Sequence, residues 1–174
     1  TRNHSSAASD VYKRQKGAGM IEPNMATMLA FIMTDAKINS FDLNKCLKDA
    51  VDVSFNRITV DGDQSTNDTV LMLANGLDDR YELNPNSNEW NDFTIALKEV
   101  CFELAMMIVH DGEGADRFIT LKVIGALNDN EADIAARSVA NSLLNKTAWA
   151  GSYPDWGRIM DCLLYTSDAA DEWL

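Results

Sequence analysis

The sequence predicts a layered domain of the α/β or α+β class. Short apolar runs of strand length alternate along the chain with longer segments whose apolar residues recur at helical spacing. Neither internal repeats nor low-complexity tracts interrupt this alternation. The 174 residues, 46% of which are hydrophobic, are enough for one domain or a large part of one. Together these observations favour helices packed against a sheet around a common apolar core.

Two elements are expected in residues 28–55. Residues 28–34 form a continuous apolar run, which is typical of a short strand buried on both faces. Ser40 can cap a helix that continues to about Phe55. The apolar residues of this helix share one face, as in an amphipathic helix, and they are Leu43, Leu47, Ala50, Val51 and Phe55.

The next stretch is rich in turn-forming residues. Residues 58–60 are β-prone, and a polar loop follows at residues 61–68. Residues 69–74 fit either a strand or a helix, because periodicity does not separate the two in so short a run. Asn75-Gly76 is expected to end that element, and residues 78–91 are expected to form a surface loop.

The longest helical pattern runs from about Asn91 to Val109. Two closely spaced glycines within residues 110–114 are expected to end it. Its apolar stripe consists of Phe93, Leu97, Val100, Cys101, Leu104 and Ile108.

Further elements are expected toward the C-terminus. Residues 118–125 alternate well enough for a strand. Asp129 can cap a helix that extends to about Leu144. Residues 147–150 are a candidate for a last short strand, and residues 154–158 read as a turn. The expected inward residues of the helix are Ala132, Ala135, Ala136, Val139 and Leu143.

The two ends of the chain do not have the character of natural protein sequence. Residues 5–15 can be encoded by an oligonucleotide whose reverse complement, in another frame, encodes residues 162–172. Two natural protein segments have no reason to be opposite strands of one DNA. We therefore interpret residues 1–15 and 162–174 as non-native, adapter-like segments and exclude them from the fold prediction, as for a cloning scar.

The charge balance argues against several classes of protein. Without the terminal segments, 12 basic and 23 acidic residues remain, a net charge of −11. Such a chain is a poor candidate for nucleic-acid binding, which needs clustered Lys and Arg. No apolar run reaches the roughly 20 residues of a membrane-spanning helix, so no membrane partner is expected. Cys46 and Cys101 lie in apolar helical patterns and are expected to be buried free thiols.

No metal site is expected. Residues 61–68 resemble the start of a calcium-binding loop, but Thr66 stands where that loop needs glycine and Met72 where it needs glutamate. No cluster of Cys and His suits zinc. We expect instead an ordered polar loop that packs near an active site.

Ala26-Thr27 is the clearest candidate for a reactive site in the sequence. A threonine that follows a small residue can attack the carbonyl group before it, cut its own chain and emerge with a free α-amine. That amine can then act as the base for the threonine hydroxyl. On local chemistry alone Thr27 is a candidate nucleophile, with an ordinary strand residue as the alternative.

Four segments carry a resemblance to one family. They are residues 16–29, 54–68, 110–115 and 154–159, and together they resemble the ornithine acetyltransferases of the ArgJ family. Their order and spacing match throughout residues 16–161. One departure lies at residues 152–156, where the family tends to have Asp-Pro-Asn-Trp. The resemblance implies an ArgJ- and DmpA-like fold, with helices packed on mixed β-sheets, that is incomplete here.

The resemblance also implies the chemistry of a glutamate N-acetyltransferase. Cleavage between Ala26 and Thr27 separates an α chain, of which residues 16–26 are the end, from a β chain that contains residues 27–161. Thr27 then takes acetyl from N-acetylornithine, releases ornithine and passes the acetyl to glutamate. Lys16 and Glu113 match substrate-binding positions, with Lys16 suited to a carboxylate and Glu113 to an ammonium group.

Several expectations about assembly follow from the same resemblance. It implies a cytoplasmic enzyme of arginine biosynthesis in which each β chain binds its own α chain, in an α2β2 heterotetramer. No cofactor is implied, although some members also use acetyl-CoA as a co-substrate, as an amino-acid N-acetyltransferase does. Most of the α chain, with its oxyanion hole, and the end of the β chain are absent, so the 174-residue chain is expected to be inactive and to fold poorly.

Two other functions remain open on the sequence. An N-terminal-nucleophile aminopeptidase or amidase shares self-cleavage and a terminal nucleophile, but passes the acyl group to water. A non-enzymatic binding module would keep Thr27 as a structural residue and leave the chain intact. The identity of the acyl acceptor separates the first alternative from the acetyltransferase, and the intactness of the chain separates the second.

Overall fold

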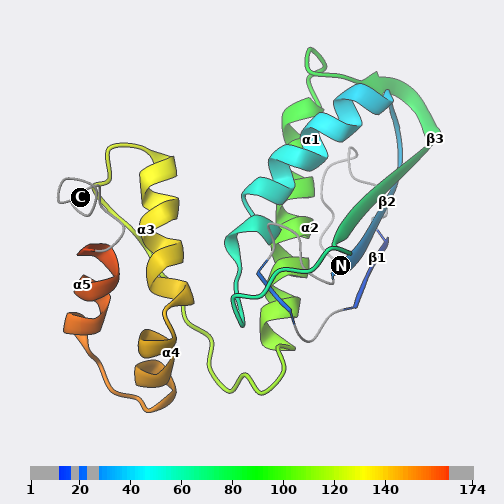
Figure 1. Cartoon of the computed structure of the whole chain (residues 1–174). Coiled ribbons are helices and arrows are strands. Elements are labelled where there is room, and N and C mark those ends of the chain that lie inside the picture. The colour runs from blue at the N-terminus through cyan, green and yellow to red at the C-terminus, as the bar shows by residue number, and fades with distance from the viewer. Residues whose placement is uncertain (1–11, 17–19, 23–27, 165–174) are drawn as a thin grey trace. The chain divides into compact units, whose positions relative to one another are not determined.

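A computed structural model of the chain describes residues 12–16, 20–22 and 28–164 (Figure 1). For residues 12–16 and 79–81 only the backbone is described. The chain divides into two compact units, residues 1–113 and residues 114–174.

The first unit is built on a three-stranded sheet. Its strands are β1 (Tyr12–Lys16), β2 (Leu29–Ile38) and β3 (Thr69–Leu83), in the spatial order β1-β2-β3. β1 runs antiparallel to β2, and β3 runs parallel to it, so the sheet is mixed as the predicted fold class requires. A parallel pair needs a crossover connection, which here contains α1 (Ser40–Asp52) and the single 3-10 turn η1 (Phe55–Arg57).

The predicted strand at residues 28–34 is confirmed, but only one of its faces is buried. Along β2, Ala30 and Ile32 are fully buried, whereas Leu29 and Met33 are 40% and 41% exposed. Helices α1 and α2 (Trp90–His110) lie on one side of the sheet (Figure 1). No described element of this unit covers the other side, which explains the alternation.

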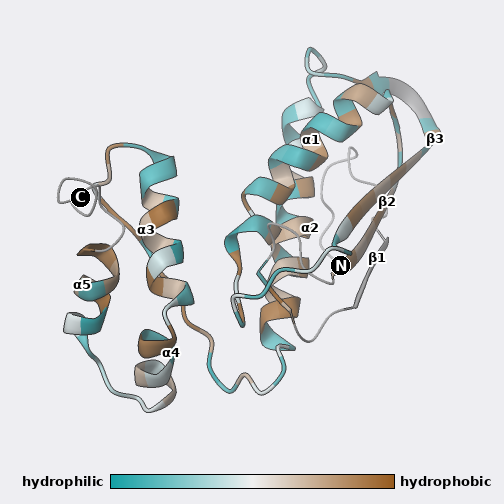
Figure 2. Ribbon diagram, in the orientation of Figure 1, coloured by the Kyte–Doolittle hydropathy of each residue, from teal (hydrophilic) through white to brown (hydrophobic). Residues whose placement is uncertain are grey.

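β3 is longer than the sequence predicts. Asn75-Gly76 does not end the strand, which continues to Leu83 before a short loop. Gly76 adopts a φ of +68°, and the register with β2 shifts between Thr34 and Ala36. The glycine therefore forms an irregularity inside the strand, because pairing with β2 resumes beyond it. Figure 2 shows hydrophobic residues along both strands before this point.

Helix α1 begins where predicted and ends earlier. Asn39, not Ser40, is the N-cap, since its side chain accepts a hydrogen bond from the Asp42 amide at 2.9 Å. The helix ends at Asp52, and the Ser54 hydroxyl donates to the Ala50 carbonyl at 2.6 Å. This turn sends Phe55 into the core, where it is fully buried. The β-prone residues 58–60 are not a strand.

Helix α2 confirms the longest helical prediction. Its buried residues are Phe93, Leu97, Cys101, Leu104, Ala105 and Ile108. Cys46 and Cys101 are buried free thiols, as predicted. Burial raises the pKa of Cys46 from 9.0 to about 11 and that of Cys101 to about 12.

The second unit contains three helices and no strand within its described residues. They are α3 (Asp129–Asn141), α4 (Leu143–Ala150) and α5 (Trp156–Leu164). The strands predicted at residues 118–125 and 147–150 are wrong, since the former is irregular and the latter lies in α4. A strand needs a partner to pair with, and the described part of this unit offers none.

The helix predicted from Asp129 to Leu144 is interrupted. Asn128 caps α3 by accepting from the Glu131 amide at 2.9 Å, and Ser142 then ends α3 and caps α4. Leu143, which was expected to face inward, is 73% exposed, whereas Val139 is buried as expected. The turn predicted at residues 154–158 is wrong, because the turn lies at residues 151–152 and α5 starts at Trp156.

Candidate active site

The predicted nucleophile lies between two described segments. Ala26 and Thr27 fall outside the described residues, as do residues 23–25. Residues 20–22 precede this gap and Met28 follows it directly. The surroundings of the site are therefore defined by what holds these two flanks.

The polar loop at residues 61–68 holds the flank that precedes the cleavage point. The Ile21 amide donates to Asp61 Oδ1 at 2.8 Å, and the Glu22 amide donates to the Asp63 carbonyl at 3.1 Å. The Val60 amide donates to the Ile21 carbonyl at 2.6 Å. These bonds join chain segments about 40 residues apart in sequence.

The opposite end of the same loop holds the flank that follows Thr27. The Met28 amide donates to Asp68 Oδ1, and the Met28 carbonyl accepts from the Thr69 amide at 2.8 Å. Residues 60–69 therefore bridge the two sides of the Ala26-Thr27 bond. The polar loop is ordered as expected, and its place near an active site stays a prediction.

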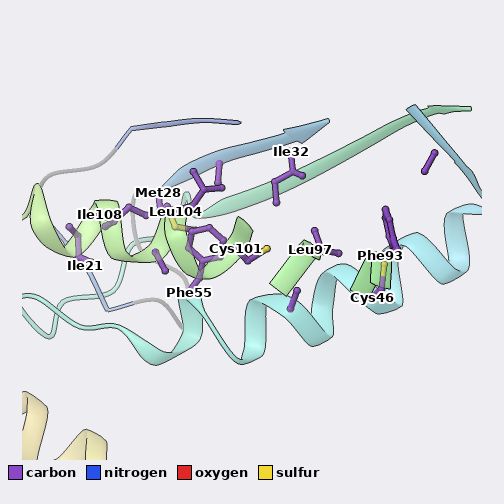
Figure 3. Packing of buried hydrophobic residues seen from close by; sticks show 14 of the residues in the cluster. Ile21, Met28, Ile32, Cys46, Phe55, Phe93, Leu97, Cys101, Leu104 and Ile108 are labelled. Carbon is purple, nitrogen blue, oxygen red and sulfur yellow. The ribbon is translucent and has the colours of Figure 1, made fainter. Parts of the chain in front are cut away.

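Both flanks are also anchored by apolar side chains. Ile21 is 3% exposed and Met28 is 5% exposed, and both belong to the core of the first unit. Figure 3 shows them at the end of the core that also holds Leu104 and Ile108. Hydrogen bonds and apolar burial thus act together on each side of the predicted cleavage point.

Asp68 is a functional candidate that the sequence did not single out. It is 4% exposed, and its Oδ2 is buried without a hydrogen-bond partner among the described residues. Burial raises the pKa of this carboxyl, and the hydrogen bond from the Met28 amide partly offsets that effect. In the sequence, Asp68 looked no different from the exposed Asp61 and Asp63, since only the parallel pairing of β2 with β3 brings it to Met28.

Lys16 and Glu113 occupy different parts of the first unit. Lys16 ends β1 and is paired with Leu29, so its backbone lies across the sheet from the residue that follows Met28. Glu113 lies just beyond α2 and is exposed. Ile108, five residues before Glu113, packs at the same end of the core as Met28 (Figure 3).

The motif at residues 154–159 has a local structural role. Asp155 Oδ1 accepts from the Arg158 amide at 3.2 Å, and Asp155 Oδ2 forms an ion pair with Arg158 Nε at 3.0 Å. Arg158 Nη1 also donates to the Leu144 carbonyl in α4 at 2.9 Å. These contacts start α5 and tie it to α4.

Two searches of the described ranges were negative. Across residues 12–16, 20–22 and 28–164, His, Cys, Asp and Glu side chains form no group of three or more that could hold a metal ion. In the same ranges no helix combines the length and apolarity needed to cross a membrane.

Comparisons with known proteins all indicate the same family. A model of the ArgJ family matches residues 3–172. The "Arginine biosynthesis bifunctional protein ArgJ" of Geobacillus kaustophilus is 52% identical over 154 residues, and that of Desulfotalea psychrophila is 54% identical over 145 residues. These alignments cover 88% and 83% of the chain but only 37% of each relative.

Solved structures agree with this match. The crystal structure of arginine biosynthesis bifunctional protein ArgJ from Bacillus halodurans superposes with a TM-score of 0.77 at 44% sequence identity. The superposition covers 81% of this chain and 66% of that one. The sequence resemblance, the family model and the shared fold agree, and the chain belongs to the ArgJ family.

Proposed function

We propose that residues 16–161 are the central part of an ornithine acetyltransferase that cleaves itself between Ala26 and Thr27. The observation that carries this proposal is the bridging of that bond by residues 60–69, in a chain of the ArgJ family. A loop that binds both flanks keeps the end of the α chain attached to the β chain after cleavage. In this proposal residues 16–26 close the α chain and residues 27–161 belong to the β chain.

The proposed reaction passes through an acetyl-threonine ester. Thr27 Oγ attacks the acetyl carbonyl of N-acetylornithine while the Thr27 α-amine takes the hydroxyl proton. The C–N bond then breaks, and ornithine leaves after its nitrogen receives that proton. The amine of glutamate attacks the ester, which yields N-acetylglutamate and returns the proton to Thr27 Oγ.

The α-amine suits this role. Its ordinary pKa is about 7.7–8.0, so a substantial fraction is neutral near pH 7.5. A base whose pKa lies close to the working pH both accepts and returns a proton readily. Thr27 therefore needs no histidine partner in this mechanism.

Charged residues account for the choice of substrate. Both N-acetylornithine and glutamate carry an α-carboxylate, which Lys16 can pair with. Glu113 is exposed and suited to the side-chain ammonium group of ornithine. In this proposal Lys16 serves both half-reactions, whereas Glu113 serves the ornithine half alone.

The proposal extends to the assembly. The enzyme is an α2β2 heterotetramer in the cytoplasm, works without a cofactor, and is able to accept acetyl-CoA as an alternative acetyl donor. The oxyanion hole lies in the part of the α chain that precedes Lys16. Removing one oxyanion donor typically costs 10²–10³ in rate, so the 174-residue chain by itself is proposed to be inactive.

An acetyl-transfer assay tests the function. The protein encoded by the complete gene, here called the full-length protein, is incubated with N-acetylornithine in the presence and absence of glutamate. We expect ornithine release that depends on glutamate and loss of activity in Thr27→Ala. Release of acetate at the same rate without glutamate would instead identify an amidase.

A further inference from the structure

Asp68 has more hydrogen-bonding capacity than its structural contact uses. Of the aspartates in the loop at residues 61–68, Asp61 and Asp63 are exposed, whereas Asp68 is 4% exposed. Its Oδ1 accepts the Met28 N–H, and its Oδ2 is buried without a partner among the described residues. Buried carboxylates are costly unless both oxygens are satisfied, so such an exception calls for a functional reason.

Covalent geometry limits the distance between this carboxylate and the Thr27 α-amine. The Met28 nitrogen belongs to the peptide bond that joins Thr27 to Met28. Three covalent bonds separate it from the Thr27 nitrogen, so the two nitrogens are within about 4 Å of each other in any backbone conformation. With a hydrogen bond added, Asp68 Oδ1 is within roughly 7 Å of that amine.

We propose that Asp68 is a positioning residue for Thr27, which fixes the peptide group after the nucleophile and stabilises the ammonium ion that forms at the Thr27 α-amine during acetyl transfer. The inference rests on the proposed function, since it needs a free amine at Thr27. When the amine takes the hydroxyl proton it becomes positively charged, and the carboxylate of Asp68 favours that state. The proton then passes to the nitrogen of departing ornithine, and Asp68 itself neither gains nor loses a proton.

The charge of Asp68 determines the direction in which the pKa of the Thr27 amine changes when Asp68 is replaced. A nearby negative charge raises the pKa of an amine, and removing it lowers that pKa by about one unit or more. The reaction requires the neutral amine, so the acidic limb of the rate profile has its midpoint at the amine pKa. Asp68→Asn should therefore move this limb to lower pH and lower kcat about tenfold, because the ammonium ion loses its counter-charge.

Other charged residues near Thr27 in the sequence or the sheet do not obscure the shift of the acidic limb. Lys16, opposite Leu29, has a positive charge that acts in the reverse direction. Glu22, Asp61 and Asp63 contribute further carboxylates on the side of the α chain. All four residues are unchanged in Asp68→Asn, so their effects cancel when its profile is compared with that of the unmodified protein.

Asp61→Asn is the matched control. Asp61 also accepts a backbone amide from a residue 40 positions away, in the same loop, but that amide belongs to Ile21. Asparagine retains one carbonyl oxygen, so both variants keep an acceptor for their amide, lose the charge and have an NH2 group in place of the second oxygen. The comparison therefore isolates the charge next to Thr27 from the stability of the loop.

The experiment measures three quantities in the full-length unmodified protein and both variants: the cleaved fraction, kcat and KM with N-acetylornithine, and the pH profile of kcat/KM. We expect an acidic limb about one pH unit lower and a kcat about tenfold lower in Asp68→Asn, with KM unchanged, whereas the acidic limb of Asp61→Asn should have the same midpoint as in the unmodified protein. A folded Asp68→Asn that remains uncleaved, while Asp61→Asn is cleaved, also supports positioning. An unshifted limb in cleaved Asp68→Asn overturns the inference but leaves the acetyltransferase intact, whereas activity in Thr27→Ala would overturn both.

A second measurement covers the case in which Asp68→Asn does not fold. The pKa of the Thr27 amine in the unmodified protein is obtained from the pH dependence of its reductive methylation. A nearby carboxylate raises the pKa of an amine, so we expect a value at or above the ordinary 7.7, approximately. A value below it would contradict the role of Asp68.

Discussion

The two units of the chain bury their apolar residues very differently. The first unit joins a sheet to α1 and α2 through a continuous core in which Ala30, Ile32, Phe55 and Cys101 are fully buried. In the second unit the buried residues among those described are only Val139, Asn145 and Ala148, while Ile124 and Leu127 are 81% and 89% exposed. One face of the sheet in the first unit therefore has the helices that its apolar residues require, and the described part of the second unit has no comparable core.

This difference shows how structure depends on partners outside the local sequence. In the first unit, residues 69–74 resolve to a strand because β2 lies beside them. In the second unit, residues 118–125 have a comparable strand pattern and stay irregular. Apolar alternation is thus realised only where a neighbouring strand supplies hydrogen bonds.

The largest expected effect comes from the core of the first unit. Phe55→Ala removes a fully buried ring and should destabilise the full-length protein by about 3–5 kcal/mol. Phe102, in α2, is 55% exposed, so Phe102→Ala is the matched control and should cost far less. Urea unfolding measures both, and equal losses would contradict the described core.

One glycine in each unit allows the backbone conformations of the two units to be compared. Gly76 in β3 has a φ of +68°, and a Cβ there would meet nothing closer than 3.9 Å, so Gly76→Ala should cost about 1–2 kcal/mol through conformation alone. Gly151 in the second unit has a φ of −76°, which alanine adopts freely. Gly151→Ala should be close to neutral in thermal unfolding, and a larger loss there than in Gly76→Ala would contradict the irregularity at Gly76 in β3.

The contacts of Asp155 test the second unit. Asp155→Ala removes the hydrogen bond that caps α5 and the ion pair with Arg158. The side chains of Asp155 and Arg158 are each only about 30% exposed, so the loss should cost about 1 kcal/mol. Asp161→Ala, on the exposed side of α5, is the control and should change stability by less than about 0.5 kcal/mol. Chemical denaturation that follows a probe in residues 114–161 distinguishes these outcomes.

The smallest effect concerns pH. The pKa values of Cys46 and Cys101 are raised in the folded state, so the stability from their neutral thiols is complete below about pH 9 and is lost as the pH rises toward 11–12. Unfolding midpoints should therefore fall as the pH rises above about 9, and fall less in Cys46→Ala/Cys101→Ala. An identical slope in that double variant would exclude the thiols as the cause.

Much of the first unit follows from the sequence alone. The stripe of α2 and the two buried thiols could be predicted, because helical periodicity is a local property that packing then reinforces. The extension of β3 through Gly76 could not, since it depends on pairing with β2. Asp68 was indistinguishable from Asp61 for the same reason: its burial arises from a contact 40 residues away. The roles of Ala26, Thr27, Lys16 and Glu113 stay predictions from the resemblance.

The central claim is that Thr27 becomes the first residue of a separate β chain, and intact-mass spectrometry of the full-length protein tests it most directly. The account predicts two polypeptides that purify together, whose masses add up to that of the uncut chain plus one water, with Ala26 as the last residue of the first chain and Thr27 as the first residue of the second. In Thr27→Ala the same measurement should give one uncut polypeptide. A single intact chain in the unmodified, active protein would contradict the account.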